Sequence, residues 1–529
     1  MENAAESKGD GTRELGIKAA KGTMIYTVGN IVGSLAVLLL LIILARILNA
    51  ADFSFYAIAI AFYNILAGHF VFGTAMRKKI PEMADKKDRI SDLISNGYVI
   101  SMIISIAVAI VAMALSGFIA TSIYHNAALT GQLMLASATV ILYALFNLTL
   151  ATLIAIDKAK EGTIMYLLYA FIQLFAAVAL VLLGYGVVGA IAGMAIGLII
   201  PSIIGIFIIA KFLDGRFTRP SWTRTKELVD FSAPVLASNV ALFVPTNLAI
   251  LLLGVYASAL TVGNYNAAFR FGSFVSVVLV SISFVLLPAF SKAFSDKDMA
   301  SKIGKIYNSS IYYTLLLLLP LLVYAVSVSH PLMYLLFSSR YTLAPFYFAV
   351  IAIGSTIGIV GTYASNLQVG YGDTRKFMYY QLLAVAIQVV LLFALTPTFG
   401  ADGALLALFV ISQILIGIIY VHVLYKQFAF KHETGRVIRL VVPSAILLVA
   451  LYFLTLALHN SMLALVTNLV AVIALFPPIV AVFGGVKREN VEFVREIGKR
   501  LKIQKPLNYI LDYAEFFIRG KSIKPNPSS

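Results

Sequence analysis

The chain has 529 residues, of which 60% are hydrophobic and 12% charged, and its formal net charge at pH 7 is +16. Its mean hydropathy of +0.93 excludes a water-soluble globular protein. Cysteine is absent, which excludes disulfides, thiolate metal sites and cysteine nucleophiles.

Apolar runs long enough to cross a bilayer recur from residue 22 to residue 484. A hydrocarbon core about 30 Å thick needs about 20 apolar residues per helix, and the runs lack the alternation of a membrane barrel. The sequence therefore predicts an all-α integral membrane protein with about fourteen transmembrane helices. Their expected ranges are 22–45, 53–76, 93–116, 131–156, 163–183, 187–210, 234–256, 263–288, 307–327, 344–370, 377–396, 402–425, 440–458 and 462–484.

Charged residues lie in alternate loops between these helices. All but three of the 40 Lys and Arg, namely Arg46, Arg270 and Arg340, fall in loops that the positive-inside rule places in the cytoplasm. All but two of the 24 Asp and Glu, Asp52 and Asp402, lie there too. We expect a multi-pass protein of the cell (cytoplasmic) membrane with both termini cytoplasmic. Topology and an anionic cytoplasmic lipid leaflet explain the basic excess, so no nucleic-acid partner is predicted.

Two halves of the chain resemble each other. Phe55–Ala59 parallels Asn264–Ala268 at an offset of 209, and Gly186–Ala190 parallels Gly400–Ala404 at an offset of 214. An even number of helices separates the equivalents, which predicts two parallel six-helix repeats, helices 1–6 and 7–12, around a central cavity. The expected organisation is a cytoplasmic N-terminal segment (1–21), an N-lobe (22–226), a C-lobe (227–439), helices 13–14 (440–484) and a basic amphipathic cytoplasmic tail (485–529).

Four motifs occur in a fixed order along the chain: Leu44–Asn49 with Phe53–Tyr56, Val262–Arg270, Gly370–Lys376 and Phe399–Ala404. In these motifs the chain resembles the multidrug/oligosaccharidyl-lipid/polysaccharide (MOP) flippase superfamily, in its polysaccharide-biosynthesis, O-antigen flippase-like branch. The resemblance implies a transporter that moves a lipid-linked oligosaccharide or polysaccharide precursor from the cytoplasmic to the outer leaflet by alternating access. Its implied partner is a polyprenyl (pyro)phosphate-linked saccharide, and other saccharide-assembly proteins stay open as partners.

Arg270 stands about seven residues inside an otherwise apolar helix. The phosphate of a lipid-linked sugar must cross a low-dielectric core, and a guanidinium pairs well with phosphate oxygens. Asn266 and Ser273 share its helix face. We therefore predict that Arg270 binds the substrate phosphate. The alternative is an arginine that reaches the outer interface or bonds the carbonyls of neighbouring helices.

Several amides within the spans are candidates for binding sugar hydroxyls or, alternatively, for bonding between helices. Asn239 and Asn247 are favoured because they flank Pro245, where freed backbone groups often face a cavity. Arg46 ends the first span and either contacts the emerging sugar or pairs with Asp52. The predicted substrate-binding set is thus Arg270, Asn266, Ser273, Asn239, Asn247 and Arg46.

Two other functions stay open. A cation antiporter for drugs or metabolites, resembling the MATE exporters, normally carries an intramembrane carboxylate, which no predicted span contains well inside. A saccharide polymerase or ligase needs clustered titratable residues in a large outer loop. Walker sequences, paired metal-binding histidines and nucleophile elbows are missing from the sequence. We therefore expect a protein that is not an enzyme, with no catalytic residue, cofactor or metal.

Overall fold

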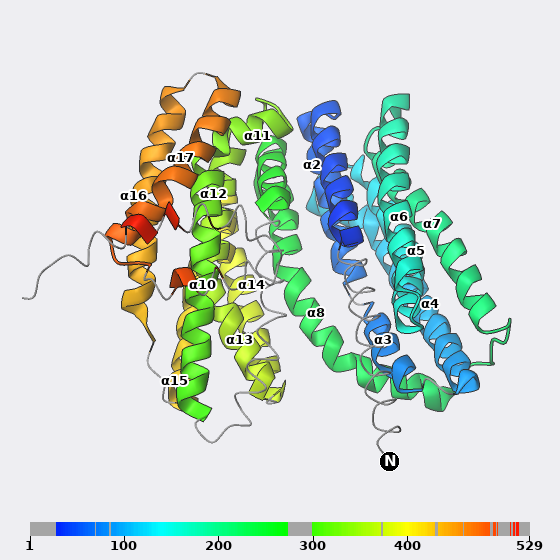
Figure 1. The fold of residues 1–529 in the computed structure, drawn as a ribbon. Helices are drawn as coiled ribbons and strands as arrows, with labels where there is room; N and C mark the ends of the chain where they lie inside the picture. The colour runs from blue at the N-terminus through cyan, green and yellow to red at the C-terminus, as the bar shows by residue number, and fades with distance from the viewer. Residues whose placement is uncertain are drawn as a thin grey trace, which may run out of the picture. The chain divides into compact units, whose positions relative to one another are not determined.

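The computed structural model describes residues 28–68, 70–83, 86–272, 299–371, 374–428, 432–458 and 460–486, together with 490–492, 495, 508, 512–513 and 515–517. Every regular element in these ranges is helical (Figure 1). The helices are α2 (Ala50–Ala67), α3 (Phe72–Glu82), α4 (Lys87–Phe118), α5 (Leu129–Ala155), α6 (Ala159–Leu180), α7 (Gly186–Phe212), α8 (Trp222–Tyr256), α10 (Met299–Ser327), α11 (Ser329–Phe337), α12 (Ala344–Ile357), α13 (Ile359–Tyr371), α14 (Thr374–Leu405), α15 (Ser412–Phe428), α16 (Thr434–Ala457) and α17 (Ser461–Val482).

Further helical segments complete this set. The helix before α2 is described over Val28–Ile47, and another helix is described over 259–272. Three π-helical turns, η1 (Ile119–Ile123), η2 (Val181–Tyr185) and η3 (Leu406–Ile411), continue α4, α6 and α14.

Ten helices in the described ranges are long and apolar enough to cross a membrane. Two of them, Ala159–Phe212 and Met378–Phe428, have 54 and 51 residues, more than twice what one span needs. Each contains a reversal and covers two predicted spans. The predicted all-α membrane fold is confirmed.

The two long segments reverse at glycines with left-handed backbone. The φ angle is +94° at Gly184, +50° at Gly186 and +57° at Gly400, conformations that favour glycine. A Cβ on Gly197 of α7 would lie 2.9 Å from the Cβ of Gln173 on α6. In the second segment the rings of Tyr380 and Tyr420, equally far from Gly400 in sequence, are 5.6 Å apart. Both predicted turns are therefore reversals between antiparallel helices.

The second predicted span, 53–76, is wrong in its extent. Helix α2 ends at Ala67, where the amide of Gly68 donates to the carbonyl of Asn64 at 3.0 Å, and α3 begins only at Phe72. A Cβ on Gly73 would lie 2.8 Å from the Cβ of Ala151, so the break lets α3 pack closely on α5. Hydropathy cannot show this break because both sides are apolar.

The seventh helix also begins earlier than predicted. Helix α8 starts at Trp222, twelve residues before the predicted span. Its first turns carry charged residues that a hydropathy criterion excludes from a span. One of them, Glu227, accepts a bond from Lys79 at 2.5 Å.

The described chain divides into two compact units. The first contains the described residues up to Ala267 together with Gln381–Ala404. Here α5 is the central helix and packs against α2, α3, α4, α6 and α7, while α8 packs against α2, α3 and α4. The assignment of α8 to a C-lobe, and the lobe boundaries in general, stay predictions from the sequence repeat.

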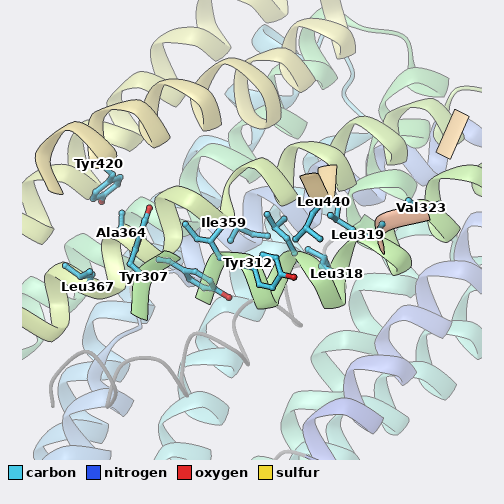
Figure 2. Packing of buried hydrophobic residues seen from close by; sticks show 14 of the residues in the cluster. Tyr307, Tyr312, Leu318, Leu319, Val323, Ile359, Ala364, Leu367, Tyr420 and Leu440 are labelled. Carbon is cyan, nitrogen blue, oxygen red and sulfur yellow. The ribbon is translucent and has the colours of Figure 1, made fainter. Parts of the chain in front are cut away.

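The second unit contains the described residues of Ala268–Tyr380 and those from Leu405 onward. Helix α10 packs against α11, α12, α13, α15, α16 and α17. Figure 2 shows part of the resulting core, in which buried tyrosines stand beside aliphatic side chains such as Ile359 and Leu440. Tyr312 is 1% exposed and donates to the carbonyl of Gly485 at 2.6 Å, which fixes the chain after α17 to the core.

The two chain ends lie largely outside the described residues. The predicted N-terminal segment 1–21 lies wholly outside them. In the predicted amphipathic tail, Arg495 pairs with Asp512 at 2.5 Å and with Glu515 at 3.4 Å. The location of this tail on the cytoplasmic leaflet stays a prediction.

Candidate substrate-binding site

The helix that carries Arg270 begins after a short break in the backbone. Residue Ala257, after α8, is extended, and the hydroxyl of Ser258 accepts from the backbone amide of Thr261 at 3.2 Å. This is the usual capping contact of a serine at a helix N-terminus. The new helix is described from residue 259 to residue 272 and corresponds to the eighth predicted span.

Asn266 is a buried amide with unused bonding capacity. Its side chain is 1% exposed, and within the described structure neither its amide nitrogen nor its carbonyl oxygen has a hydrogen-bond partner. Asn264, by comparison, donates to the carbonyl of Leu260 at 2.7 Å. An unpaired buried amide costs about 1–3 kcal/mol, so Asn266 keeps hydrogen-bonding capacity that no described residue uses.

Arg270 lies four residues after Asn266 and is half-buried. Residues spaced by four share a helix face, with Cβ atoms about 5–6 Å apart. A guanidinium and an unpaired amide therefore occupy one face of one helix. Together they offer a cation and both donor and acceptor groups to an anionic, hydroxyl-rich ligand.

Aromatic side chains hold the last described residues of this helix against α12 and η3. The ring of Phe271 packs edge-on against Phe348 at 5.3 Å, and the ring of Phe269 lies 6.3 Å from that of Phe409. A Cβ on Gly272 would lie 2.7 Å from Ile351. The backbone around Arg270 is thus closely packed, which fixes the origin of its side chain.

Asn247 has partners within the protein. It is 4% exposed, its amide nitrogen donates to the carbonyl of Phe243 at 2.7 Å, and its oxygen accepts from the amide of Asn64 on α2 at 3.1 Å. This is the interhelical bonding that the sequence left open as an alternative. A role of Asn247 in substrate binding stays a prediction.

The three remaining predicted site residues are Ser273, Asn239 and Arg46. Ser273 lies outside the described residues, and Asn239 lies in α8 with its side chain outside them. Arg46 is exposed near the end of the first described helix. Asp52, its predicted alternative partner, accepts from the side chain of Asn49 at 2.8 Å while the oxygen of Asn49 caps α2. Of the six predicted residues, the structure brings Arg270 and Asn266 to one helix face.

The first unit contains a cluster of tyrosines that sequence reasoning did not single out, together with Asn147, one of the candidate amides within the predicted spans. The rings of Tyr63 on α2 and Tyr143 on α5 are 5.8 Å apart, and Asn147 donates to the Tyr143 hydroxyl at 3.3 Å. Two residues after Asn147, Thr149 bonds the hydroxyl of Tyr98 on α4 at 2.8 Å. Tyrosines within apolar spans are compatible with ordinary packing, so only the tertiary structure shows that three helices, α2, α4 and α5, bring them together.

A second group that the sequence did not reveal lies in the second unit, where α15 ends and α16 begins. Arg436 donates to Glu433 at 3.1 Å, and its guanidinium lies 4.1 Å over the ring of Tyr312. His432 packs edge-on against Tyr307 at 5.3 Å, and burial lowers the pKa of its imidazole. In the sequence these charges were attributed to topology alone.

Solved structures of membrane transporters share this fold. The chain matches a lipid II flippase, MurJ, in an inward closed conformation with a TM-score of 0.69 and 17% identity, over 87% of this chain and 98% of that one. It matches an inward-facing multidrug resistance MATE family transporter of the MOP superfamily with a TM-score of 0.64 and 15% identity, over 75% and 94%. At these identities the similarity shows the fold.

Sequence comparisons agree with the predicted branch of the superfamily. The succinoglycan biosynthesis transport protein ExoT of Rhizobium meliloti (strain 1021) is 28% identical over 169 residues, which are 32% of this chain and 33% of that protein. The match thus spans about a third of that relative's length. The family model described as polysaccharide biosynthesis protein matches residues 43–344, more than half of the chain, and the protein therefore belongs to the polysaccharide biosynthesis protein family.

Proposed function

We propose that the protein is a flippase that moves a lipid-linked oligosaccharide or polysaccharide precursor from the cytoplasmic to the outer leaflet of the cell membrane by alternating access. Membership of the polysaccharide biosynthesis family and the named transport role of one relative support this function. A lipid II flippase among the proteins of the same fold supports it further. In this proposal both termini are cytoplasmic, as the distribution of charges indicates.

One observation carries the proposal at the level of residues. Arg270 shares a helix face with Asn266, a fully buried amide whose polar atoms lack partners in the described part of the chain. A phosphate taken into the membrane needs a cation, and the sugar next to it needs hydrogen-bond donors and acceptors. Arg270 binds the phosphate in paired hydrogen bonds, and Asn266 bonds the adjoining phosphate or sugar oxygens.

The test measures transfer of a fluorescent pyrophosphate-linked oligosaccharide to the opposite leaflet of reconstituted liposomes. We expect protein-dependent transfer to fall at least about tenfold in Arg270→Ala, the loss of about 1.4 kcal/mol of binding. Arg270→Lys should restore part of the rate, because an ammonium keeps the charge but loses the paired geometry. Arg340→Ala removes the same charge from a loop between α11 and α12 and serves as the control.

Two outcomes contradict this proposal in different ways. Transfer at the wild-type rate by a folded Arg270→Ala variant removes the phosphate role. If the wild-type protein transfers no lipid-linked saccharide but exports a cationic dye under an ion gradient, the protein is an antiporter like the multidrug transporters of the same fold. Growth of the saccharide chain on the lipid would instead identify a polymerase.

A further inference from the structure

Two adjoining cavities lie in the second unit along α15. The first has a volume of about 310 Å³ and is lined by polar residues at the start of α16 and by Asn308, Ile311 and Tyr312 of α10. The second has a volume of about 530 Å³ and follows α15 from Gln413 to Tyr425. They share Val360, Val421 and His432 as lining residues. Each volume lies in the range of about 300–1,000 Å³ that is typical of small-molecule sites.

The larger cavity is apolar and opens beside side chains that face outward. Ile414 is 45% exposed and Ile418 60% exposed, exposures that in a transmembrane helix bring aliphatic side chains into contact with lipid. A Cβ added to Gly417 would have no neighbour within 4 Å. This glycine therefore leaves open space in the wall of the cavity, at a depth where hydrocarbon chains lie.

The smaller cavity has its charged groups at the membrane boundary. Glu433 and Arg436 stand at the beginning of the span Thr434–Ala457, where polar headgroups lie. Arg436 gives one bond to Glu433 at 3.1 Å and is held over the ring of Tyr312. An arginine has five N–H donors, so further donors stay available for a ligand. The amide oxygen of Asn308 accepts from the backbone of Glu433 at 3.3 Å, which fixes the position of the acid.

Among the described residues that line the smaller cavity the charges balance, and this balance selects the headgroup. Arg436 contributes one positive and Glu433 one negative charge, and partial burial lowers the pKa of the His432 imidazole, which favours its neutral form. An anionic headgroup would leave Glu433 facing like charge, and a pyrophosphate would do so more strongly. A phosphate joined to an ammonium group complements both residues.

We propose that these two cavities bind a phospholipid with a zwitterionic amine headgroup, such as phosphatidylethanolamine. The phosphate lies at Arg436, the ammonium group lies at Glu433, and an acyl chain occupies the apolar cavity along α15. The occupant is a lipid of the surrounding bilayer, so this site is separate from the substrate site at Arg270. It would tie the stability of the second unit to the lipid composition of the membrane.

The test measures lipid retained by the purified full-length protein with native mass spectrometry, after adding phosphatidylethanolamine or phosphatidylglycerol with identical acyl chains at pH 7.5. We expect wild type to retain phosphatidylethanolamine at least tenfold more strongly than phosphatidylglycerol. Arg436→Gln should lose most of the bound lipid. Glu433→Gln should lose the preference and bind phosphatidylglycerol at least as well, because the repulsive carboxylate is gone.

Steric variants test the position of the acyl chain. Gly417→Leu should fill the apolar cavity and lower retention of phosphatidylethanolamine at least tenfold without unfolding the protein. Gly131→Leu on α5, where a Cβ also meets nothing within 4 Å, is the matched control and should retain the lipid. Lys87→Gln, which breaks the exposed 3.2 Å pair with Asp214 in the first unit, controls for loss of a charge.

Three results would overturn the proposal. The first is equal or stronger retention of phosphatidylglycerol by the wild-type protein. The second is unchanged lipid retention in both Gly417→Leu and Arg436→Gln, with both variants folded as judged by their melting curves. The third is displacement of the bound phospholipid by a polyprenyl pyrophosphate-linked saccharide, which would make these cavities part of the substrate pathway.

Discussion

The segments α6–α7 and α14–α15 occupy matching places in the two sequence repeats but pack differently. Both reverse at glycines with left-handed backbone, Gly184 and Gly186 in the first and Gly400 in the second. Beyond the reversal, α7 carries Gly189, Gly193 and Gly197, whereas the second segment has Gly403, Ala407 and Ile411 at positions 214 residues later. The turn is repeated, and the glycine stripe after it is not.

The stripe determines how each returning helix packs. Small residues spaced by four let two membrane helices approach closely, and a Cβ on Gly193 would clash with the backbone of Ala177 on α6. In the second segment Gly403 still lies close to the backbone of Leu395 on α14, but further along the segment the close approach is to another helix, because a Cβ on Gly354 of α12 would meet Phe409. Cavities then remain along α15. The same turn motif thus occurs in two settings. In the first segment α7 packs closely on α6, and in the second segment the returning helix packs closely on α12.

The largest effect is expected from Gly193→Leu, which breaks the glycine stripe. The added side chain must displace the backbone of α6, and such overpacking costs typically 1–3 kcal/mol and sometimes more. We expect a large fall in melting temperature and in the amount of folded protein recovered in detergent. Gly131→Leu, at a position with open space, should melt within a degree or two of wild type. Equal melting of both variants would show that the stripe is not a packing contact.

Gly400→Ala tests the shared turn rather than the stripe. At Gly400 the backbone has φ +57° and ψ −131°, a combination that costs a residue with a side chain about 1–3 kcal/mol. Loss of stability should be clear in thermal melting. Gly417→Ala, in the interior of α15, should by comparison be neutral or stabilising by up to about 1 kcal/mol, because alanine favours helix. A Gly400→Ala variant as stable as wild type would argue against a required left-handed turn.

Sequence reasoning found the features that are local. Long apolar runs predict helices. Gly184, Gly186 and Gly400 mark the reversals, because the left-handed backbone of each turn depends on only a few neighbouring residues. The break between α2 and α3 was missed because Phe70 and Val71 are as apolar as the helices around them. The start of α8 was missed because Glu227 lowers the hydropathy of its first turns below that of a membrane span, although these turns are helical.

The candidate site shows the same limit. Arg270 is visible in the sequence because a lone cation in an apolar run is expensive. The lack of a hydrogen-bond partner for Asn266 among the described residues and the bond between Asn64 and Asn247 depend on which helices meet, and no single-sequence pattern encodes this. Glu433 and Arg436 were hidden for a different reason. Loop charges already had an explanation in topology, so only the cavity beside them gives them another role.

Ala407→Gly tests whether the two segments can pack alike, because it places in the second segment the residue that the first segment has at the equivalent position, Gly193. If close approach to a partner helix depended on this position in both segments, glycine would be tolerated or favoured. The second segment instead packs Ala407 fully buried within η3, so we expect only the loss of helix propensity, about 1 kcal/mol. Thermal melting against wild type measures it, and an increase in stability would show that α15 accepts the packing of α7.

The smallest effect is expected from the histidine beside the cavities of the second unit. Burial lowers the pKa of His432, so the folded state binds fewer protons there than the unfolded chain does. Its contribution to stability is therefore complete above the ordinary histidine pKa of about 6.5 and declines as the pH falls below that value. Among the described residues, the groups around it are Tyr307 from α10, His422 in the lining of the larger cavity, and Glu433 and Arg436 at the start of α16. Melting curves at pH 7.5 and pH 5.5 should show a smaller acid-induced decrease in His432→Gln than in wild type, since the variant lacks this group while the other acids and bases are retained. Parallel decreases in the two proteins would mean that the imidazole is hydrated in the folded state and that the cavity next to it is open to water.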